Sequence, residues 1–154
     1  MTFSLRTAGP EDEVFIERLL KVTLADELMA HAWPEQIREN LLAMQYHGRR
    51  QSASSSYPNT GIDIIAIEGA DAGWLAVART EDSIHLVDIV LLSEHRGVGV
   101  GTAILEALCQ ESHQSRKPVR LHVMVSNRAA RLYERLGFRD VHSDEVNREM
   151  EWLP

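Results

Sequence analysis

The amino-acid sequence predicts a single α/β domain of the α+β type, whose sheet is mixed and mostly antiparallel, with helices flanking it. Segments with strand-like alternation and segments with helical spacing follow one another in the order β-α-α-β-β-β-α-β-α-β-β. Three of these strands are separated only by short turns, which predicts an antiparallel meander. The chain of 154 residues has the length of one ordinary domain, so we expect one domain over residues 1–154.

The N-terminal part is predicted to hold one strand and the start of a helix. Residues 3–6 alternate between apolar and polar side chains, which is typical of a half-buried strand. Pro10 and the acids at 11–13 then predict a helix start, because proline is tolerated at the first helical position and acids favour the positive helix end. The apolar positions expected to continue this helix are Phe15, Leu19 and Val22.

A second helix is expected to precede the meander. It should begin at Pro34 and continue through Ile37, Leu41 and Met44. Residues 51–60 contain several serines and Tyr57-Pro58, so we predict a loop there. The three meander strands are predicted at 62–68, 74–80 and 84–92, with turns at 69–73 and 81–83.

The second half of the chain changes character. A Gly-rich loop at 93–101 precedes a helix whose apolar stripe is formed by Val100, Ala103, Ile104, Ala107 and Leu108. A strand is predicted at 119–125 and a helix after Ser126-Asn127, with Gly137 as its C-terminal stop. Closing strands are expected at 138–141 and 147–152.

Composition excludes several classes of protein. With 44% hydrophobic and 25% charged residues, the chain is neither disordered nor a disulfide scaffold, and no apolar run reaches the length of a membrane span. The single cysteine, Cys109, fits a reducing compartment, and the N-terminus has no basic segment followed by an apolar stretch, so we expect a cytoplasmic protein. A net charge of −7 argues against general nucleic-acid binding.

This net charge hides an asymmetry. Residues 94–140 carry eight Arg/Lys against five Asp/Glu, whereas the rest of the chain carries eight against eighteen. A locally positive stretch in an acidic protein is a modest indication of an anionic ligand, although chance is about equally plausible on charge alone.

The Gly-rich loop is the most informative segment. Arg96 and the three glycines at 97, 99 and 101 stand between a strand and a helix, where backbone N–H groups can converge on a phosphate. A Walker A loop needs a Lys that is missing here, and a Rossmann fingerprint needs G-x-G-x-x-G with an acid on the next strand. Both nucleotide-binding patterns therefore fail.

A third pattern fits. Residues 96–101, Arg-Gly-Val-Gly-Val-Gly, resemble the R/Q-x-x-G-x-G/A signature of the GCN5-related N-acetyltransferase (GNAT) superfamily. Residues 121–138, a strand followed by N-x-x-A-x-x-L-Y-x-x-x-G-F, resemble the second signature of the same family. The order of elements also agrees over essentially the whole chain. The resemblance implies a GNAT-like domain in which strands 84–92 and 119–125 are parallel and splay apart.

The resemblance also implies ligands and roles. The expected ligand is acetyl-CoA or coenzyme A, without a metal. Tyr133 would protonate the leaving thiolate, and backbone N–H groups at 90–92 would hold the pantetheine arm and polarise the thioester carbonyl. The residues expected to bind the cofactor are Val90, Leu91, Leu92, Arg96, Gly97, Val98, Gly99, Val100, Gly101, Thr102, Asn127 and Tyr133. Asn127 could equally be a helix cap.

Two residues of strand 84–92 are candidates for the general base. His85 has a suitable reference pKa of about 6.5, and Asp88 is a lone acid in an apolar run that needs a reason to be buried. In a regular strand their side chains would point to opposite faces. Asp88 could instead be a structural acid, and we predict that neither residue belongs to a metal site.

The predicted function is transfer of an acetyl or other short acyl group from acyl-CoA to a primary amine by direct attack. The alternative is a CoA-binding sensor of this fold without turnover. The acceptor would be a small molecule or a peptide, and the excess of acid outside 94–140 weakly favours a cationic one. Dimers are common in the family, so a homodimer is compatible. Candidates to line the acceptor pocket are Trp33, Met44, Tyr46 and Tyr57.

Overall fold

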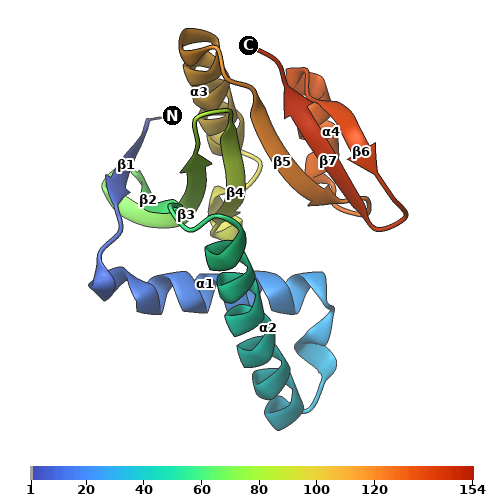
Figure 1. Cartoon of the computed structure of the whole chain (residues 1–154). Helices are drawn as coiled ribbons and strands as arrows, with labels where there is room; N and C mark the ends of the chain where they lie inside the picture. Colours follow the sequence, from blue (N-terminus) through green and yellow to red (C-terminus); the bar gives the residue numbers. More distant parts are fainter. Residues whose placement is uncertain (1) are drawn as a thin grey trace.

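The computed structural model describes residues 2–154 as a seven-stranded sheet with helices on both faces (Figure 1). Met1, which belongs to the expected domain 1–154, lies outside the described residues. The strands are β1 (Phe3–Thr7), β2 (Gly61–Ile67), β3 (Ala70–Arg79), β4 (Ile84–Leu91), β5 (Val119–Met124), β6 (Arg139–Ser143) and β7 (Asn147–Trp152). The helices are α1 (Glu13–Glu27), α2 (Glu35–Ser56), α3 (Val100–Ser115) and α4 (Ala129–Leu136), with 3-10 turns η1 (Pro10–Asp12), η2 (Ala30–Ala32) and η3 (Ser93–His95).

The sheet has the order β1-β2-β3-β4-β5-β7-β6, and only the β4–β5 pair is parallel. This confirms the predicted mixed, mostly antiparallel sheet. The two parallel strands pair only where Ile84–Leu86 lie beside Val119–Leu121, although β4 continues to Leu91. Beyond that point they diverge, as Figure 1 shows, so the sheet opens at its centre.

The sheet separates two apolar cores. Ile64 and Ile65 are neighbours on β2 and are fully buried on opposite faces, as the alternation of a strand requires. Ile64 packs with α1 and α2 in a cluster that includes Ile16, Leu20, Trp74 and Ala76. Ile65 packs with α3 and α4 in a larger cluster that includes Leu75, Ile104, Leu105 and Met150. Both faces of the central strands are therefore covered, and only the gap between β4 and β5 interrupts the middle layer.

The predicted loop at 51–60 is wrong over its first six residues. Helix α2 runs through Gln51 and ends at Ser56, and only 57–60 form the loop. Serine has a modest helix propensity, whereas Pro58 lacks an N–H and disfavours helical backbone at Tyr57, so the stop comes from the proline. The extra helical turns bring Ser52 and Ala53 close to β4.

The apolar stripes chosen for α1 and α2 are only partly correct. Val22, Ile37 and Met44 are exposed, Met44 by 64%, while Leu42 and Tyr46 form the buried face of α2. The pattern was ambiguous because α2 is apolar on more than one side. The predicted turn at 69–73 is also shorter: Glu68 and Gly69 alone make it, both with positive φ, and β3 already begins at Ala70.

Candidate active site

A β-bulge in β4 brings the two candidate bases to the same side of the sheet. Ala76 on β3 pairs with Asp88, but Val77 pairs with Leu86, so Val87 is the extra residue. The bulge shifts the alternation of β4 by one residue. His85 and Asp88 consequently line one hollow of about 230 Å³, together with His122 of β5. The expectation that they face opposite sides is wrong because β4 is not a regular strand.

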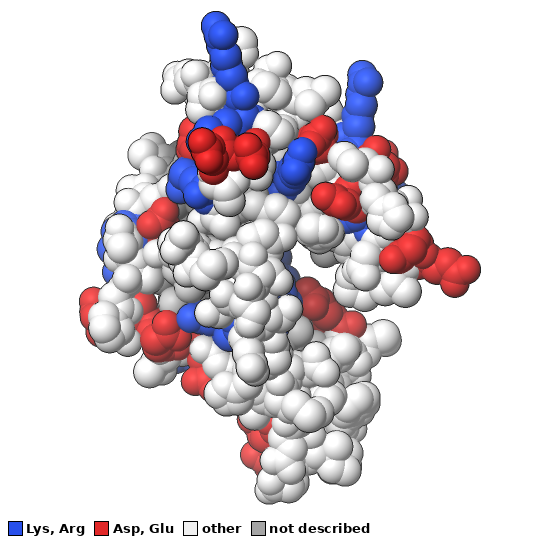
Figure 2. All heavy atoms as spheres, viewed as in Figure 1, with Lys and Arg blue, Asp and Glu red and all other residues white. Residues whose placement is uncertain are grey.

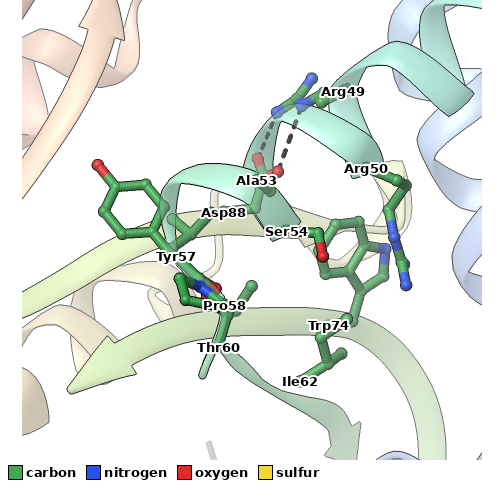
Figure 3. A pocket seen from close by; sticks show the side chains of 12 residues that line it. Arg49, Arg50, Ala53, Ser54, Tyr57, Pro58, Thr60, Ile62, Trp74 and Asp88 are labelled. Carbon is green, nitrogen blue, oxygen red and sulfur yellow. Dashed lines mark hydrogen bonds and ion pairs between the residues drawn. The ribbon is translucent and has the colours of Figure 1, made fainter. Parts of the chain in front are cut away.

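Asp88 is held by an arginine from α2. Arg49 donates from Nε to Oδ2 of Asp88 at 3.2 Å and from Nη2 to Oδ1, which makes a two-point ion pair (Figure 3). Burial raises the pKa of the Asp88 carboxyl, and the Arg49 guanidinium opposes this. The Asp88 carboxylate is thus compensated within the apolar run by a cation on α2 rather than by backbone N–H groups of a loop.

His85 forms a hydrogen bond with Tyr57. Its Nε2 lies 2.8 Å from the Tyr57 hydroxyl, and the two rings are tilted against each other with centroids 4.3 Å apart. The side chain is 7% exposed. Burial, together with the neighbouring charges of His122 and Arg120, lowers the pKa of His85 to about 4. At neutral pH the imidazole is therefore uncharged, and one of its ring nitrogens can accept a hydrogen bond.

His122 borders this pair from the other strand. Its ring centroid is 5.3 Å from that of His85, and its Nε2 lies 3.9 Å from Oε2 of Glu149 on β7. The His122 side chain is about half exposed. Burial raises the pKa of the Tyr57 hydroxyl, and the nearby charge of Glu149 raises it further. The groups around the opening between β4 and β5 are thus one neutral imidazole, one protonated phenol and a solvent-facing histidine.

Tyr133 lies on α4, within the core on the α3 side of the sheet. It is 7% exposed, and its ring packs at 5.8 Å from that of Phe138. Burial and the charge of Asp88 raise the pKa of Tyr133 to about 12, so the phenol keeps its proton at any physiological pH.

The Gly-rich loop has the backbone that a phosphate site needs. Gly97 and Gly99 adopt φ of 73° and 92°, values that side chains rarely allow, and a Cβ at 97, 99 or 101 would meet open space. The first α3 hydrogen bond is donated by Ala103 N–H to the Gly99 carbonyl, so the preceding amides face out of the helix end. Arg96 donates to the Leu91 carbonyl at 3.0 Å, which places its guanidinium beside the end of β4.

The three residues expected to hold a pantetheine arm differ in their availability. Leu92 N–H donates to the Ala72 carbonyl of β3 at 2.8 Å and is already used. Because backbone groups alternate along a strand, Leu91 N–H faces the opposite edge, toward the opening, while Val90 is buried beside α1. Of this set, Leu91 is the residue whose amide can reach a ligand in the gap.

Asn127 caps the helix that carries Tyr133. Its Oδ1 accepts a hydrogen bond from Ala129 N–H at 2.9 Å, and its side chain is exposed. The side-chain oxygen of Asn127 is therefore used as a helix cap, and its amide nitrogen remains at the surface beside the end of β5.

Comparison with known proteins now decides the family. A family model described as "Acetyltransferase (GNAT) domain" matches residues 31–154. The chain belongs to the GNAT family. A relative from Sulfurisphaera tokodaii, an N-alpha-acetyltransferase, is 40% identical over 60 residues, 37% of this chain and 36% of the relative. An uncharacterized N-acetyltransferase from Methanocaldococcus jannaschii is 33% identical over 91 residues, 56% of each chain. The matches thus span about a third to a half of these curated relatives.

Solved structures of acetyltransferases share the whole fold. The PaiA N-acetyltransferase from Thermoplasma acidophilum, solved in complex with coenzyme A, superposes with a TM-score of 0.73 at 18% identity and covers 100% of both chains. An acetyltransferase from Thermus thermophilus gives a TM-score of 0.71 at 16% identity, covering 100% of this chain and 98% of the other. At this identity the likeness concerns the fold, and it confirms the GNAT-like domain.

The GNAT signatures found the loop and Tyr133 but missed the arginines of α2. Arg49 and Arg50 lie in a stretch with no motif. Arg49 is 39 residues from its partner Asp88 and Arg50 is 37 residues from its partner Glu13, so no local pattern could pair them. Of the four residues predicted to line an acceptor pocket, Tyr57 lines both the hollow that contains His85 and a second pocket beside it. Tyr46 is buried between α1 and α2, while Trp33 and Met44 are exposed.

Two classes of feature are not found within residues 2–154. No group of three or more His, Cys, Asp or Glu side chains is arranged to hold a metal ion. No helix in the same range is long and apolar enough to cross a membrane. Cys109 is buried in α3, and burial raises the pKa of its thiol to about 11, so the thiol stays protonated at neutral pH.

Proposed function

We propose that this chain is an N-acetyltransferase that transfers the acetyl group of acetyl-CoA directly to a primary amine. Membership of the GNAT family supports the reaction class. The observation that carries the proposal is that β4 and β5 diverge beyond Leu86 and that buried His85 lines the hollow at this opening. Direct transfer needs one group that accepts a proton and one that donates a proton, and His85 and Tyr133 would fill those roles.

The residues fit the proposed cofactor. The amides at 97–102, with positive φ at Gly97 and Gly99 and the α3 end behind them, would hold the pyrophosphate. Leu91 N–H would hold the acyl-pantetheine end, and the Asn127 amide lies near the same opening. When bound, acetyl-CoA supplies the thioester as acetyl donor. A backbone N–H directed at the carbonyl would stabilise the charge that develops on its oxygen.

The proton path follows from the His85–Tyr57 pair. With the ring proton on Nδ1, His85 Nε2 accepts the Tyr57 hydroxyl hydrogen at 2.8 Å. As the amine nitrogen bonds to the acetyl carbon, its proton would pass to the Tyr57 oxygen while the Tyr57 proton passes to His85. The carbon–sulfur bond would break as the Tyr133 hydroxyl donates its hydrogen to the departing sulfur. Exchange with solvent would then return a proton to Tyr133 and remove the one on His85. Asp88, with both oxygens on Arg49, would position the α2 end rather than act as the base.

The proposal is tested by thiol release from acetyl-CoA across a broad panel of primary amines, with native mass spectrometry of the same sample. We expect a CoA-bound species and amine-dependent thiol release. Bound CoA without release for any amine would identify a sensor of this fold, and the absence of a CoA-bound species at saturating acetyl-CoA would remove both functions.

Within the site, His85→Gln should lower kcat about a hundredfold, whereas Asp88→Asn should act mainly on stability.

A further inference from the structure

A second pocket adjoins the hollow that contains His85. It has a volume of about 140 Å³, several times the room that one water needs. Its wall is formed by the end of α2, the 57–60 loop and the strands β2, β3 and β4 (Figure 3). Tyr57, Asp88, Arg49, Ala53 and Val87 line both spaces. A molecule bound at Tyr57 and His85 can therefore extend directly into this second pocket.

Two buried donors in this pocket lack acceptors. Among the described residues, Trp74 Nε1 and Arg50 Nη1 are the buried side-chain nitrogens or oxygens without a hydrogen-bond partner, and both residues line the pocket. Trp74 is 1% exposed, so its N–H cannot reach bulk water. Figure 3 shows its indole nitrogen and the Arg50 guanidinium on the same side of the pocket. Leaving such a donor unpaired costs about 1–3 kcal/mol, so an acceptor in the pocket that reached both nitrogens would recover this cost.

Charge decides which acceptor fits. Asp88 is already neutralised by Arg49 at two points. Arg50 uses only Nη2, which lies 3.2 Å from Glu13, a half-exposed residue on α1. The cation is therefore only partly compensated. A carboxylate has two acceptor oxygens, no proton and one negative charge, which matches two donors and one partly compensated arginine.

We propose that the acceptor amine also carries a carboxylate, bound by Arg50 Nη1 and Trp74 Nε1 while its amine lies at Tyr57 and His85. This inference rests on the proposed acetyl transfer and specifies its substrate class. It departs from the expectation of a merely cationic acceptor, because the acid excess of the chain does not extend into this pocket: its lining has two arginines against one aspartate.

The first test uses matched amines that differ only in the carboxylate. For glycine, β-alanine, 4-aminobutyrate and 6-aminohexanoate, each compared with the alkylamine lacking the carboxylate, we expect kcat/KM to be at least tenfold higher for one or more of the acids. Arg50→Met or Trp74→Phe should abolish this preference and leave kcat/KM for the alkylamine within about twofold. Arg38→Met, on the same helix but outside the pocket, is the matched control and should retain the preference.

The second test does not require turnover. In calorimetric titration of the CoA-saturated protein with the same amino acids, we expect binding that Arg50→Met and Trp74→Phe each weaken about ten- to hundredfold. Binding with this dependence but without turnover of any amine would remove the proposed function and keep the carboxylate site. Alkylamines acetylated as well as the acids, or binding that neither variant weakens, would overturn the carboxylate site and leave acetyl transfer intact.

Discussion

The pKa of His85 links the proposed chemistry to stability. Burial lowers the pKa of its imidazole from 6.5 to about 4, so the unfolded chain binds a proton there between these values while the folded protein does not. The stabilisation is complete above pH 6.5 and is lost as the pH falls to about 4. We expect this group alone to remove about 3 kcal/mol of the free energy of unfolding between pH 7 and pH 4.

Urea denaturation of the native protein and of His85→Gln at both pH values measures this. The substitution removes the titrating group, so the drop in the free energy of unfolding should be smaller by about that amount in the variant. His113→Gln is the control, because His113 is exposed on α3, and the drop in that variant should match the drop in the native protein. An equal drop in the native protein and in His85→Gln would show that His85 titrates normally and would remove its role as a neutral base.

The Tyr133 hydroxyl can be removed without removing its ring. Tyr133→Phe retains the packing against Phe138, so we expect an unchanged fold and an unchanged KM for acetyl-CoA. Loss of a proton donor should lower kcat by about a hundredfold. Steady-state kinetics measure both quantities, and Tyr46→Phe, buried on the opposite side of the sheet, is the control that should keep kcat. A kcat within twofold in Tyr133→Phe would remove the phenol from the reaction.

At the scale of elements, the β3–β4 pair carries both the bulge and the approach of Gly73. A Cβ on Gly73 would lie 2.2 Å from the Val90 carbonyl oxygen and 3.0 Å from the Leu91 Cα. These atoms belong to backbone and cannot turn away, so β4 would have to shift at the edge that faces the opening. The glycine thus supports the position of Leu91, whose amide we assign to the ligand.

Gly73→Ala should therefore lower both stability and cofactor affinity. We expect a loss of about 1–3 kcal/mol in the free energy of unfolding from overpacking, together with weaker acetyl-CoA binding. Gly48→Ala is the matched control. Gly48 is exposed in α2 and a Cβ there would have nothing within 4 Å, so alanine should raise the free energy of unfolding by about 0.5–1 kcal/mol. Urea denaturation and calorimetry compare them, and a stable Gly73→Ala with native affinity would contradict the close approach.

For the whole molecule, the periodicity and turn residues predicted every strand and helix in the correct order. Gly137, with φ of 103°, ends α4 as expected, and the glycines at 97 and 99 bend the loop as expected. Local signals sufficed there because a glycine at positive φ or a strand alternation is determined within a few residues.

The site depends on contacts that local signals do not contain. The bulge at Val87 arises from pairing with β3, and it alone decides that His85 and Asp88 share a hollow. The Arg49–Asp88 pair joins residues 39 positions apart, and the unpaired Trp74 N–H is known only from the packing around it. The sequence could therefore propose His85, Asp88 and Tyr133 as candidates but could not predict how they are arranged.

The GNAT fold makes one further prediction about the molecule as a unit. Acetyl-CoA would contact β4, the Gly-rich loop and the end of β5, which come together only in the folded chain. It should therefore bind the folded state and not the unfolded state, and so stabilise the protein by mass action. At a concentration of 100 Kd this amounts to about 2.7 kcal/mol, or about 5–10 °C in Tm for a domain of this size. ATP and NAD should give no shift, because the loop lacks the Walker lysine and the Rossmann spacing.

Thermal denaturation with each ligand measures this, and Gly99→Asp should abolish the acetyl-CoA shift through like charge beside the phosphates. Gly69→Asp has the same kind of backbone, with φ of 82° and open space around it, so it carries the same strain outside the loop and should keep the shift. A shift retained in Gly99→Asp, or lost equally in both variants, would remove the Gly-rich loop from the cofactor site.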